Sequence, residues 1–172
     1  MHRISLIVSH TDTTISSFIR LITGSHFNHC SIMLDMDKTK IYSYARKYEA
    51  FFFPGSFKHE TPDMLKTDGV LDAEIYTFDV TDEQFMKVTE YIHTLENSFT
   101  PYNYLIAALL PLRVKRNAVR SHTCSSFSAY ALELSGCVDL EKHYSLYSPK
   151  AMRELMVRKY HNNLTDDTSI DF

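Results

Sequence analysis

Two residues far apart in this chain, Cys124 and His29, are the best placed to do chemistry together. Cys124 lies in Thr123-Cys124-Ser125-Ser126-Phe127, where apolar spacing predicts the first turn of a helix. His29 lies in Phe27-Asn28-His29-Cys30-Ser31-Ile32 and heads a predicted strand. The partial positive charge of a helix N-terminus and a nearby imidazolium both stabilise a thiolate, which is the reactive form of cysteine. The pair therefore predicts a nucleophilic thiol served by an imidazole base.

The thiol also has a plain structural interpretation. The apolar stripe of its predicted helix contains Cys124, Phe127, Ala131 and Leu134. Free cysteine is often a small core residue, so packing alone would explain that placement. We favour the nucleophile because Cys124 stands at the first turn, after polar residues, where the helix dipole acts. Cys30 within a strand and Cys137 past a helix end are interpreted as packing residues.

The sequence also contains other histidines and allows other chemistries. The nearest rival of His29 is His26, with His10 and His122 as weaker rivals. A zinc site built from histidine and cysteine is conceivable, but no pair of ligand motifs is present, so no metal is expected. Phosphate-binding, dinucleotide-binding and serine-hydrolase motifs are also missing, and we expect no cofactor.

An imidazole base usually needs a third polar group to hold its tautomer. Two candidates remain open in this sequence. Ser43 is favoured by hairpin geometry, because it lies on the strand that follows His29. Glu60 is favoured by chemistry, because a carboxylate orients an imidazole better than a hydroxyl does.

Strands and helices alternate irregularly along the chain. Period-two patterns predict strands over residues 3–9, 29–35, 40–45 and 73–80, and the second and third form a hairpin. Helical patterns are predicted over residues 13–22, 102–110, 124–134 and 149–159. A further helix follows the capping box Thr81-Asp82-Glu83-Gln84, and residues 48–57 are interpreted as an aromatic loop.

This mixture favours an α+β fold, in which an antiparallel sheet packs against helices. The chain has 172 residues, of which 44% are apolar, and it shows no internal repeat. That size suits one domain, which we place at residues 1–160. Residues 161–172 are polar and acidic, and we expect them to form a loosely held tail.

Charge and cysteine usage limit the possible partners and compartment. The net charge of −3 gives no general attraction to nucleic acid. The basic residues between Arg113 and Arg120 are interpreted as a solvated loop that could also favour a thiolate or attract an anionic group. No signal peptide or membrane-spanning stretch is evident. Three cysteines without an export signal indicate a cytoplasmic protein without disulfides.

The two motifs resemble a known family. Papain-like cysteine hydrolases of the permuted NlpC type have a histidine strand, which is similar to His29-Cys30-Ser31-Ile32-Met33-Leu34-Asp35. They also have a cysteine helix, which is similar to the segment from Thr123 to Leu132 followed by Gly136. In that branch the histidine hairpin precedes the cysteine helix, as it does here. Residues 42–47 running into Pro54-Gly55-Ser56-Phe57 also look like uncharacterised bacterial members. The family commonly places His, Glu, Gln or Asn where this hairpin offers Ser43.

The resemblance implies a circularly permuted papain-like fold and a cysteine hydrolase or acyltransferase. Cys124 would attack an amide or ester carbonyl, His29 would take its proton, and a thioester acyl-enzyme would follow. Peptides, cell-wall fragments and acyl lipids are the substrates that the family implies. The alternative is a catalytically inactive papain-like module that binds a peptide or lipid. The sequence does not identify the oligomeric state.

Overall fold

The fold is an antiparallel sheet covered on one face by helices. The computed structural model describes residues 1–11, 25–46, 55–98, 100–103, 112, 114–115 and 121–165. Within these residues the sheet has five strands in the order β4-β3-β2-β1-β7. Every neighbouring pair is antiparallel. The expected α+β class, with an antiparallel sheet packed against helices, is therefore confirmed.

Four of the five strands, all except β4, lie close to where the sequence predicted them. They are β1 (His2–Ser9), β2 (His29–Leu34), β3 (Ile41–Arg46), β4 (Gly55–Glu60) and β7 (Ala73–Val80). A tight turn joins β2 and β3, in which Asp35 and Met36 adopt positive φ values of 52° and 56°. The predicted hairpin of β2 and β3 is confirmed.

Strand β4 was not predicted, and the interpretation of residues 48–57 as a loop is wrong from Gly55 onward. Polar residues dominate β4, so its sequence lacks a clear apolar alternation. Pairing with β3 nevertheless extends from Arg46–Gly55 to Ile41–Glu60. A small separate hairpin follows, formed by β5 (Lys66–Thr67) and β6 (Val70–Leu71).

The helices begin and end at residues whose side chains cap them. Helix α2 (Asp82–Glu96) and helix α4 (Cys124–Ser135) both start with a complete capping box. Helix α4 ends at Gly136, whose φ of 72° is left-handed. Helix α5 (Pro149–Lys159) follows the N-cap Ser148 and has proline in its first turn. All three helices were predicted, α2 from its capping box, α4 from its apolar spacing and Gly136, and α5 from Ser148 and Pro149.

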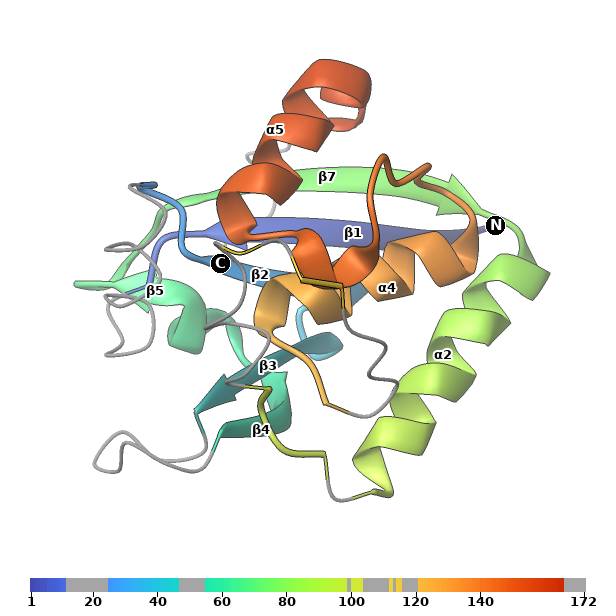
Figure 1. Ribbon diagram of the computed structural model, residues 1–172, viewed down its shortest axis with the longest axis horizontal. Helices are drawn as coiled ribbons and strands as arrows, with labels where there is room; N and C mark the ends of the chain where they lie inside the picture. Colours follow the sequence, from blue (N-terminus) through green and yellow to red (C-terminus); the bar gives the residue numbers. More distant parts are fainter. Residues whose placement is uncertain are drawn as a thin grey trace.

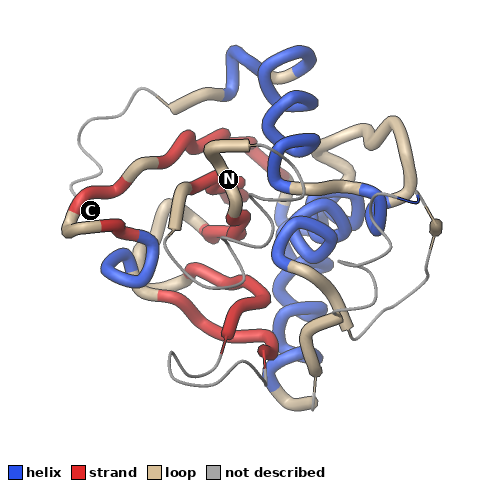
Figure 2. The backbone as a smooth tube through the Cα atoms, turned by 60° about the vertical axis from the view of Figure 1, so that its left-hand side comes forward, coloured by secondary structure: helices blue, strands red, loops and turns tan. Residues whose placement is uncertain are grey.

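Helices α2, α4 and α5 lie on the same side of the sheet (Figures 1 and 2). Helix α4 contacts β2 and β3, while α2 and α5 flank it and reach β1. The main core lies between these two layers and contains Leu6, Ile32 and Phe127, each fully buried. Helix α4 is therefore the central element of the helical layer, and its buried face lies against the hairpin that contains His29.

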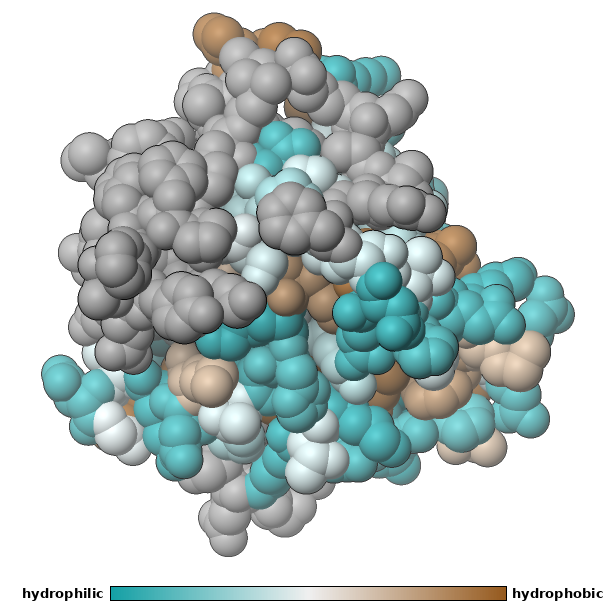
Figure 3. All heavy atoms as spheres, turned by 90° about the horizontal axis from the view of Figure 1, so that it is seen from below, coloured by the Kyte–Doolittle hydropathy of each residue, from teal (hydrophilic) through white to brown (hydrophobic). Residues whose placement is uncertain are grey.

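The opposite face of the sheet has a second, smaller core, in which Ile7, Met33 and Ile41 pack on Leu65. Leu65 belongs to the short 3₁₀ helix η1 (Pro62–Leu65). Successive residues of a strand point to opposite faces, so His29 and Ser31 share this face with Met33. Among the coloured residues in Figure 3, hydrophilic ones predominate and hydrophobic areas are scattered between them. The exposed large apolar residues are likewise spread over several elements.

The first part of the expected tail is attached to the sheet. Leu164 forms a bridge with Tyr76 of β7, and the Thr165 amide donates to the Ile75 carbonyl at 2.7 Å. The Asn163 side chain also donates to the Thr77 carbonyl at 2.9 Å. These contacts cover the outer edge of β7, so residues 161–165 are held by backbone pairing that their polar composition did not reveal.

Several expected features lie outside the described residues. These are the helix at 13–22, most of the helix at 102–110, residues 48–54 of the aromatic loop, the basic residues Arg113, Arg116 and Arg120, and tail residues 166–172. Within the described part of the chain, no helix combines the length and apolar character needed to cross a bilayer.

Candidate active site

Cys124 is the first residue of helix α4, and hydrogen bonds hold the turn around it. The Thr123 hydroxyl accepts from the Ser126 amide at 3.2 Å, and the Ser126 hydroxyl accepts from the Thr123 amide at 2.9 Å. The Ser125 hydroxyl donates to the Tyr147 carbonyl at 2.7 Å, which ties this turn to the segment before α5. The Cys124 thiol therefore has a fixed position at the positive end of the helix.

His29 begins β2 and reaches Cys124 across the junction of sheet and helix. Its paired neighbour on β1 is Ser9. On the other side, the ladder between β2 and β3 contains only Ile32–Tyr42 and Met33–Ile41, so it stops short of His29. The Cys124 side chain lies close enough to the His29 ring to be one of the groups that raise its pKa. The tertiary structure thus brings the two predicted residues together.

Both candidates for the third group also lie beside His29. The His29 Nε2 atom is 3.1 Å from Oε1 and 3.2 Å from Oε2 of Glu60. The Ser43 hydroxyl is 3.2 Å from the same nitrogen. Because Nε2 is occupied by these oxygens, Nδ1 is the ring nitrogen left to face the thiol. Ser43 and Glu60 therefore contact the His29 ring at the same time.

His29 and Glu60 each stabilise the charged form of the other inside the protein. Burial alone would lower the pKa of His29, but the Glu60 carboxylate and the contact with Cys124 outweigh it and raise that pKa to about 10. Burial alone would raise the pKa of Glu60, but His29, the Ser31 hydroxyl and Lys58 hold it below its usual value. At neutral pH the pair is therefore an imidazolium and a carboxylate.

Sequence reasoning did not single out Ser31, which also belongs to this cluster. Its hydroxyl donates to Glu60 Oε2 at 2.6 Å, and the side chain is fully buried. The signal that would have found it is the strand period of two, which puts Ser31 on the same face as His29. The prediction lacked strand β4, so it offered no carboxylate within reach of Ser31.

The rival histidines have other partners. His26 pairs with the Asp72 carboxylate and stacks on His10, with ring centroids 4.6 Å apart. This group is exposed to solvent at the end of the sheet. His122 is fully buried, and its Nε2 lies 2.8 Å from the Tyr91 hydroxyl. None of these rings is among the groups that shift the titration of His29.

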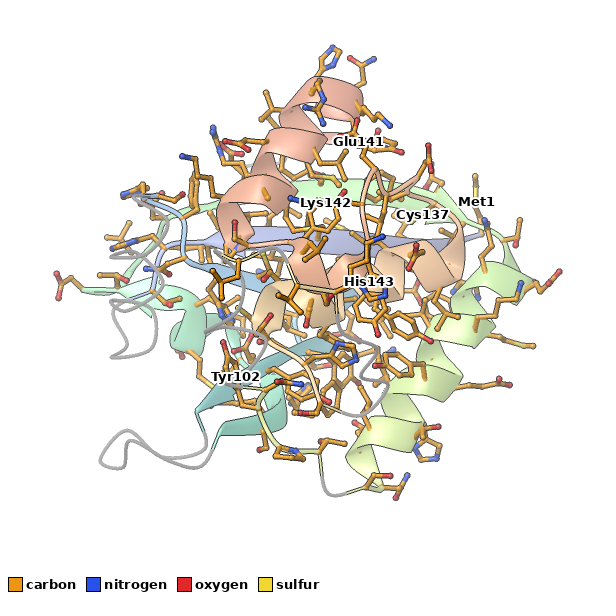
Figure 4. All side chains as sticks on the ribbon, in the orientation of Figure 1. Met1, Tyr102, Cys137, Glu141, Lys142 and His143 are labelled. Carbon is orange, nitrogen blue, oxygen red and sulfur yellow. The ribbon has the colours of Figure 1, made fainter. Side chains whose placement is uncertain are left out.

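The other two thiols have surroundings that disfavour a thiolate. Burial raises the pKa of Cys30, which is fully enclosed in the main core. Burial also raises the pKa of Cys137, although a hydrogen bond from Ser135 opposes it. Figure 4 shows Cys137 in the loop beyond the C-terminal end of α4, far along the helix from Cys124. The interpretation of both as packing residues agrees with these positions.

The cluster lies in the protein interior. The exposed fractions are 2% for Cys124, 7% for His29 and 3% for Glu60, counted over whole residues. Low local dielectric strengthens the interaction of a charged ring with a carboxylate and of a thiolate with a charged ring. No group of three or more His, Cys, Asp or Glu side chains in the described ranges is arranged to hold a metal ion.

The segment at residues 100–103 closes the sheet edge near this cluster. The Tyr102 amide donates to the Gly55 carbonyl at 2.8 Å, and the Phe57 amide donates to Thr100 at 3.2 Å. Figure 4 shows Tyr102 beside β3 and β4. The first half of strand β4 is thus bonded on both sides, to β3 and to residues 100–102.

This geometry can support proton transfer between a thiol and an imidazole that is oriented by a carboxylate. It brings together Cys124, His29, Ser43 and Glu60 from four different elements, and it adds Ser31. Comparison of the chain with protein-family models, with curated proteins and with solved structures found no match in any of the three.

Proposed function

We propose that this protein is a cysteine hydrolase or acyltransferase that cleaves an amide or ester bond through a thioester acyl-enzyme. The observation that carries the proposal is that His29, whose Nε2 is 3.1 Å from a buried carboxylate, lies close enough to Cys124 at the N-terminus of α4 for that thiol to raise the pKa of the ring. A packing cysteine would not require this charged pair beside it, since burying charged groups is costly.

In the first half-reaction, His29 holds the proton given up by the Cys124 thiol. The thiolate attacks the carbonyl carbon, and a tetrahedral intermediate forms with a negative oxygen. In this proposal the backbone N–H of Cys124, in the first turn of its helix, donates to that oxygen. The intermediate then collapses, and His29 gives its proton to the departing amine or alkoxide.

In the second half-reaction, water or another acceptor attacks the thioester. His29 takes a proton from this acceptor as the new bond forms, and the Cys124 thiolate leaves. Glu60 remains ionised throughout, because its role is to orient the ring and to stabilise the imidazolium. Ser43 contributes a second polar contact to the same ring nitrogen.

The resemblance to permuted papain-like hydrolases of the NlpC type supports the same proposal. The histidine strand precedes the cysteine helix in the chain, and the two meet at the junction of an antiparallel sheet and its helical layer. On that resemblance, the substrates are peptides, cell-wall fragments or acyl lipids. The expected cytoplasmic location is kept as part of the proposal.

The direct test is to trap the acyl-enzyme. The protein is incubated with activated esters of short and long acyl chains and with activated peptide esters, and the intact mass is followed with time. We expect an acyl adduct that maps to Cys124 and that hydroxylamine removes, since hydroxylamine cleaves thioesters. The preferred acyl group then identifies the substrate class.

Two variants complete the trapping experiment. Cys124→Ser should lose the adduct, whereas Cys137→Ser, which removes a half-buried thiol elsewhere on α4's side of the sheet, should keep it. Absence of an adduct on Cys124, or acylation at an unchanged rate in His29→Ala, would contradict the proposal. An intact fold that binds acyl or peptide ligands without reacting would instead support the inactive binding module.

A further inference from the structure

The Glu60 carboxylate receives a second donor besides His29. The Ser31 hydroxyl donates to Oε2 at 2.6 Å, and His29 Nε2 lies at similar distances from both oxygens, 3.1 and 3.2 Å. A carboxylate only accepts hydrogen bonds, so the proton in the short contact belongs to Ser31. Glu60 is the one hydrogen-bond partner that the described structure gives to this hydroxyl.

A carboxylate held by one ring nitrogen alone is poorly fixed. Because His29 Nε2 is nearly equidistant from both Glu60 oxygens, its contacts do not favour one orientation of the carboxylate plane over the other. The Ser31 hydroxyl distinguishes the two oxygens by binding only Oε2. Hydrogen bonds to ionised acceptors are shorter and stronger than neutral ones, and the 2.6 Å distance falls in that range.

Strand geometry makes Ser31 suited to this role. Ser31 and His29 are two residues apart on β2 and point to the same face of the sheet. Both side chains therefore approach Glu60 from one rigid strand, while Glu60 comes from the end of β4. Ser31 is fully buried, so water does not compete for its hydroxyl.

We propose that Ser31 is a positioning residue that locks the Glu60 carboxylate, and through it the His29 ring, in the orientation that presents Nδ1 to Cys124. This inference rests on the proposed function, because it assigns a role to Ser31 only if His29 serves the thiol. Ser31 itself touches neither the thiol nor, in this proposal, the substrate.

The test follows the rate of alkylation of Cys124 by iodoacetamide as a function of pH, which requires no knowledge of the substrate. In Ser31→Ala we expect alkylation about tenfold slower at pH 6, as expected for loss of one hydrogen bond to a charged group. The acidic limb of the profile should shift upward by about one pH unit, because the Glu60 carboxylate loses a donor that favours its ionised form. Ser31→Thr keeps the hydroxyl and should restore the profile.

Ser5→Ala is the matched control. Ser5 is also fully buried on the same face of the sheet, and its hydroxyl contacts Thr77 and Met36 at 3.0 Å each. It should lower stability without moving the pH profile. An unchanged profile in folded Ser31→Ala would overturn the inference, and so would a shift of equal size in Ser5→Ala.

The two proposals fail in different ways. If Cys124 of the wild-type protein reacts no faster than a model thiol at any pH, the proposed function fails. If it reacts fast and depends on His29 but not on Ser31, only this inference fails. Should Ser31→Ala not fold, the hydroxyl proton of Ser31 can be followed by NMR in the wild-type protein. It should resonate downfield and shift as Glu60 titrates, and a proton insensitive to that titration would overturn the inference.

Discussion

Two buried histidines lie near the cysteine, and their surroundings differ. His122 is two residues before Cys124 in the sequence, and its ring nitrogens contact the hydroxyls of Tyr91 at 2.8 Å and Ser126 at 3.2 Å. His29 is distant in the sequence, and its Nε2 contacts the carboxylate of Glu60. One ring thus contacts hydroxyls of the helical layer, and the other contacts an anion.

The partners of the two rings also differ in charge. His122 is surrounded by aromatic rings, including Tyr44, Tyr130 and Tyr144, with centroids 5.6 to 5.7 Å away. Its contact with Ser126 joins it to the capping box of α4, so it stabilises the turn that holds Cys124. His29 instead has a charged partner that favours its protonated form. Proximity in sequence therefore does not identify the base.

The largest expected effect separates the two rings by reactivity. His29→Gln should slow alkylation of Cys124 by iodoacetamide at pH 7 by about a hundredfold, because it removes the acid–base partner of the thiol. His122→Gln should slow it by less than about threefold, because it leaves that partner in place. Stopped-flow or mass-spectrometric alkylation rates give both numbers, with circular dichroism to confirm that each variant is folded. Equal losses in the two variants would erase the distinction between the rings.

The next effect concerns the third group beside His29. Glu60→Gln keeps the shape of the side chain but removes its charge, and we expect alkylation at pH 7 about thirtyfold slower, since a charge-assisted contact is stronger than a neutral one. Ser43→Ala removes one hydroxyl contact at 3.2 Å but leaves the carboxylate in place, and it should slow the reaction only about threefold. The ratio of the two rates ranks the candidates that the sequence left open. A larger loss in Ser43→Ala would reverse that ranking.

The ion pair predicts a particular dependence of stability on pH. The pKa of His29 is raised in the folded state to about 10, so its stabilising effect is complete below the unfolded value of about 6.5. That contribution declines as pH rises from there and is lost above about pH 10. Glu60, whose pKa is lowered, loses its contribution as pH falls below about 4.5.

Urea unfolding at several pH values measures this dependence. The wild type and His29→Gln differ only at residue 29, so their shared titratable groups contribute nearly equally to both unfolding free energies. The difference between these free energies should therefore shrink steadily between about pH 6.5 and pH 10, as the contribution of protonated His29 is lost. Ser5→Ala, which removes no titratable group, is the control, and its difference from the wild type should stay constant over this range. A difference that grows with pH would show that His29 is neutral in the folded protein.

The smallest expected effect tests the structural role of His122. Tyr91→Phe removes the hydroxyl that contacts Nε2 of His122 and should lower the unfolding free energy by about 1 kcal/mol. Alkylation of Cys124 should change by less than about twofold, because the turn at the start of α4 keeps its capping box. Chemical denaturation and the alkylation rate, measured on the same preparation, decide whether the two effects separate.

The elements of the fold were predictable where local signals agree. The capping box at Thr81, the apolar spacing after Cys124, the glycine at position 136 and the proline at 149 gave the helices, and apolar alternation gave β1, β2 and β7. Strand β4 was not predicted, because its residues are largely polar and its pairing with β3 is non-local. Pairing of this kind depends on the partner strand more than on intrinsic preference.

The residues of the candidate site also differ in how far the sequence predicted them. Cys124 and His29 were selected from the sequence, because each has a residue type and local position that suit its chemistry. Glu60 remained one of two alternatives, since its distance from His29 depends on β4 lying beside β3. Ser31 was missed, because a buried serine has no distinctive pattern until its acceptor is placed.

The sequence by itself determined where the helices and most strands begin and end, and which thiol stands at a helix N-terminus, because caps, turns and periodicity act over a few neighbouring residues. Only the tertiary structure decided which imidazole meets that thiol and which carboxylate orients it. Those contacts join β2, β4 and α4, and they arise from packing of the helical layer on the sheet rather than from any local preference.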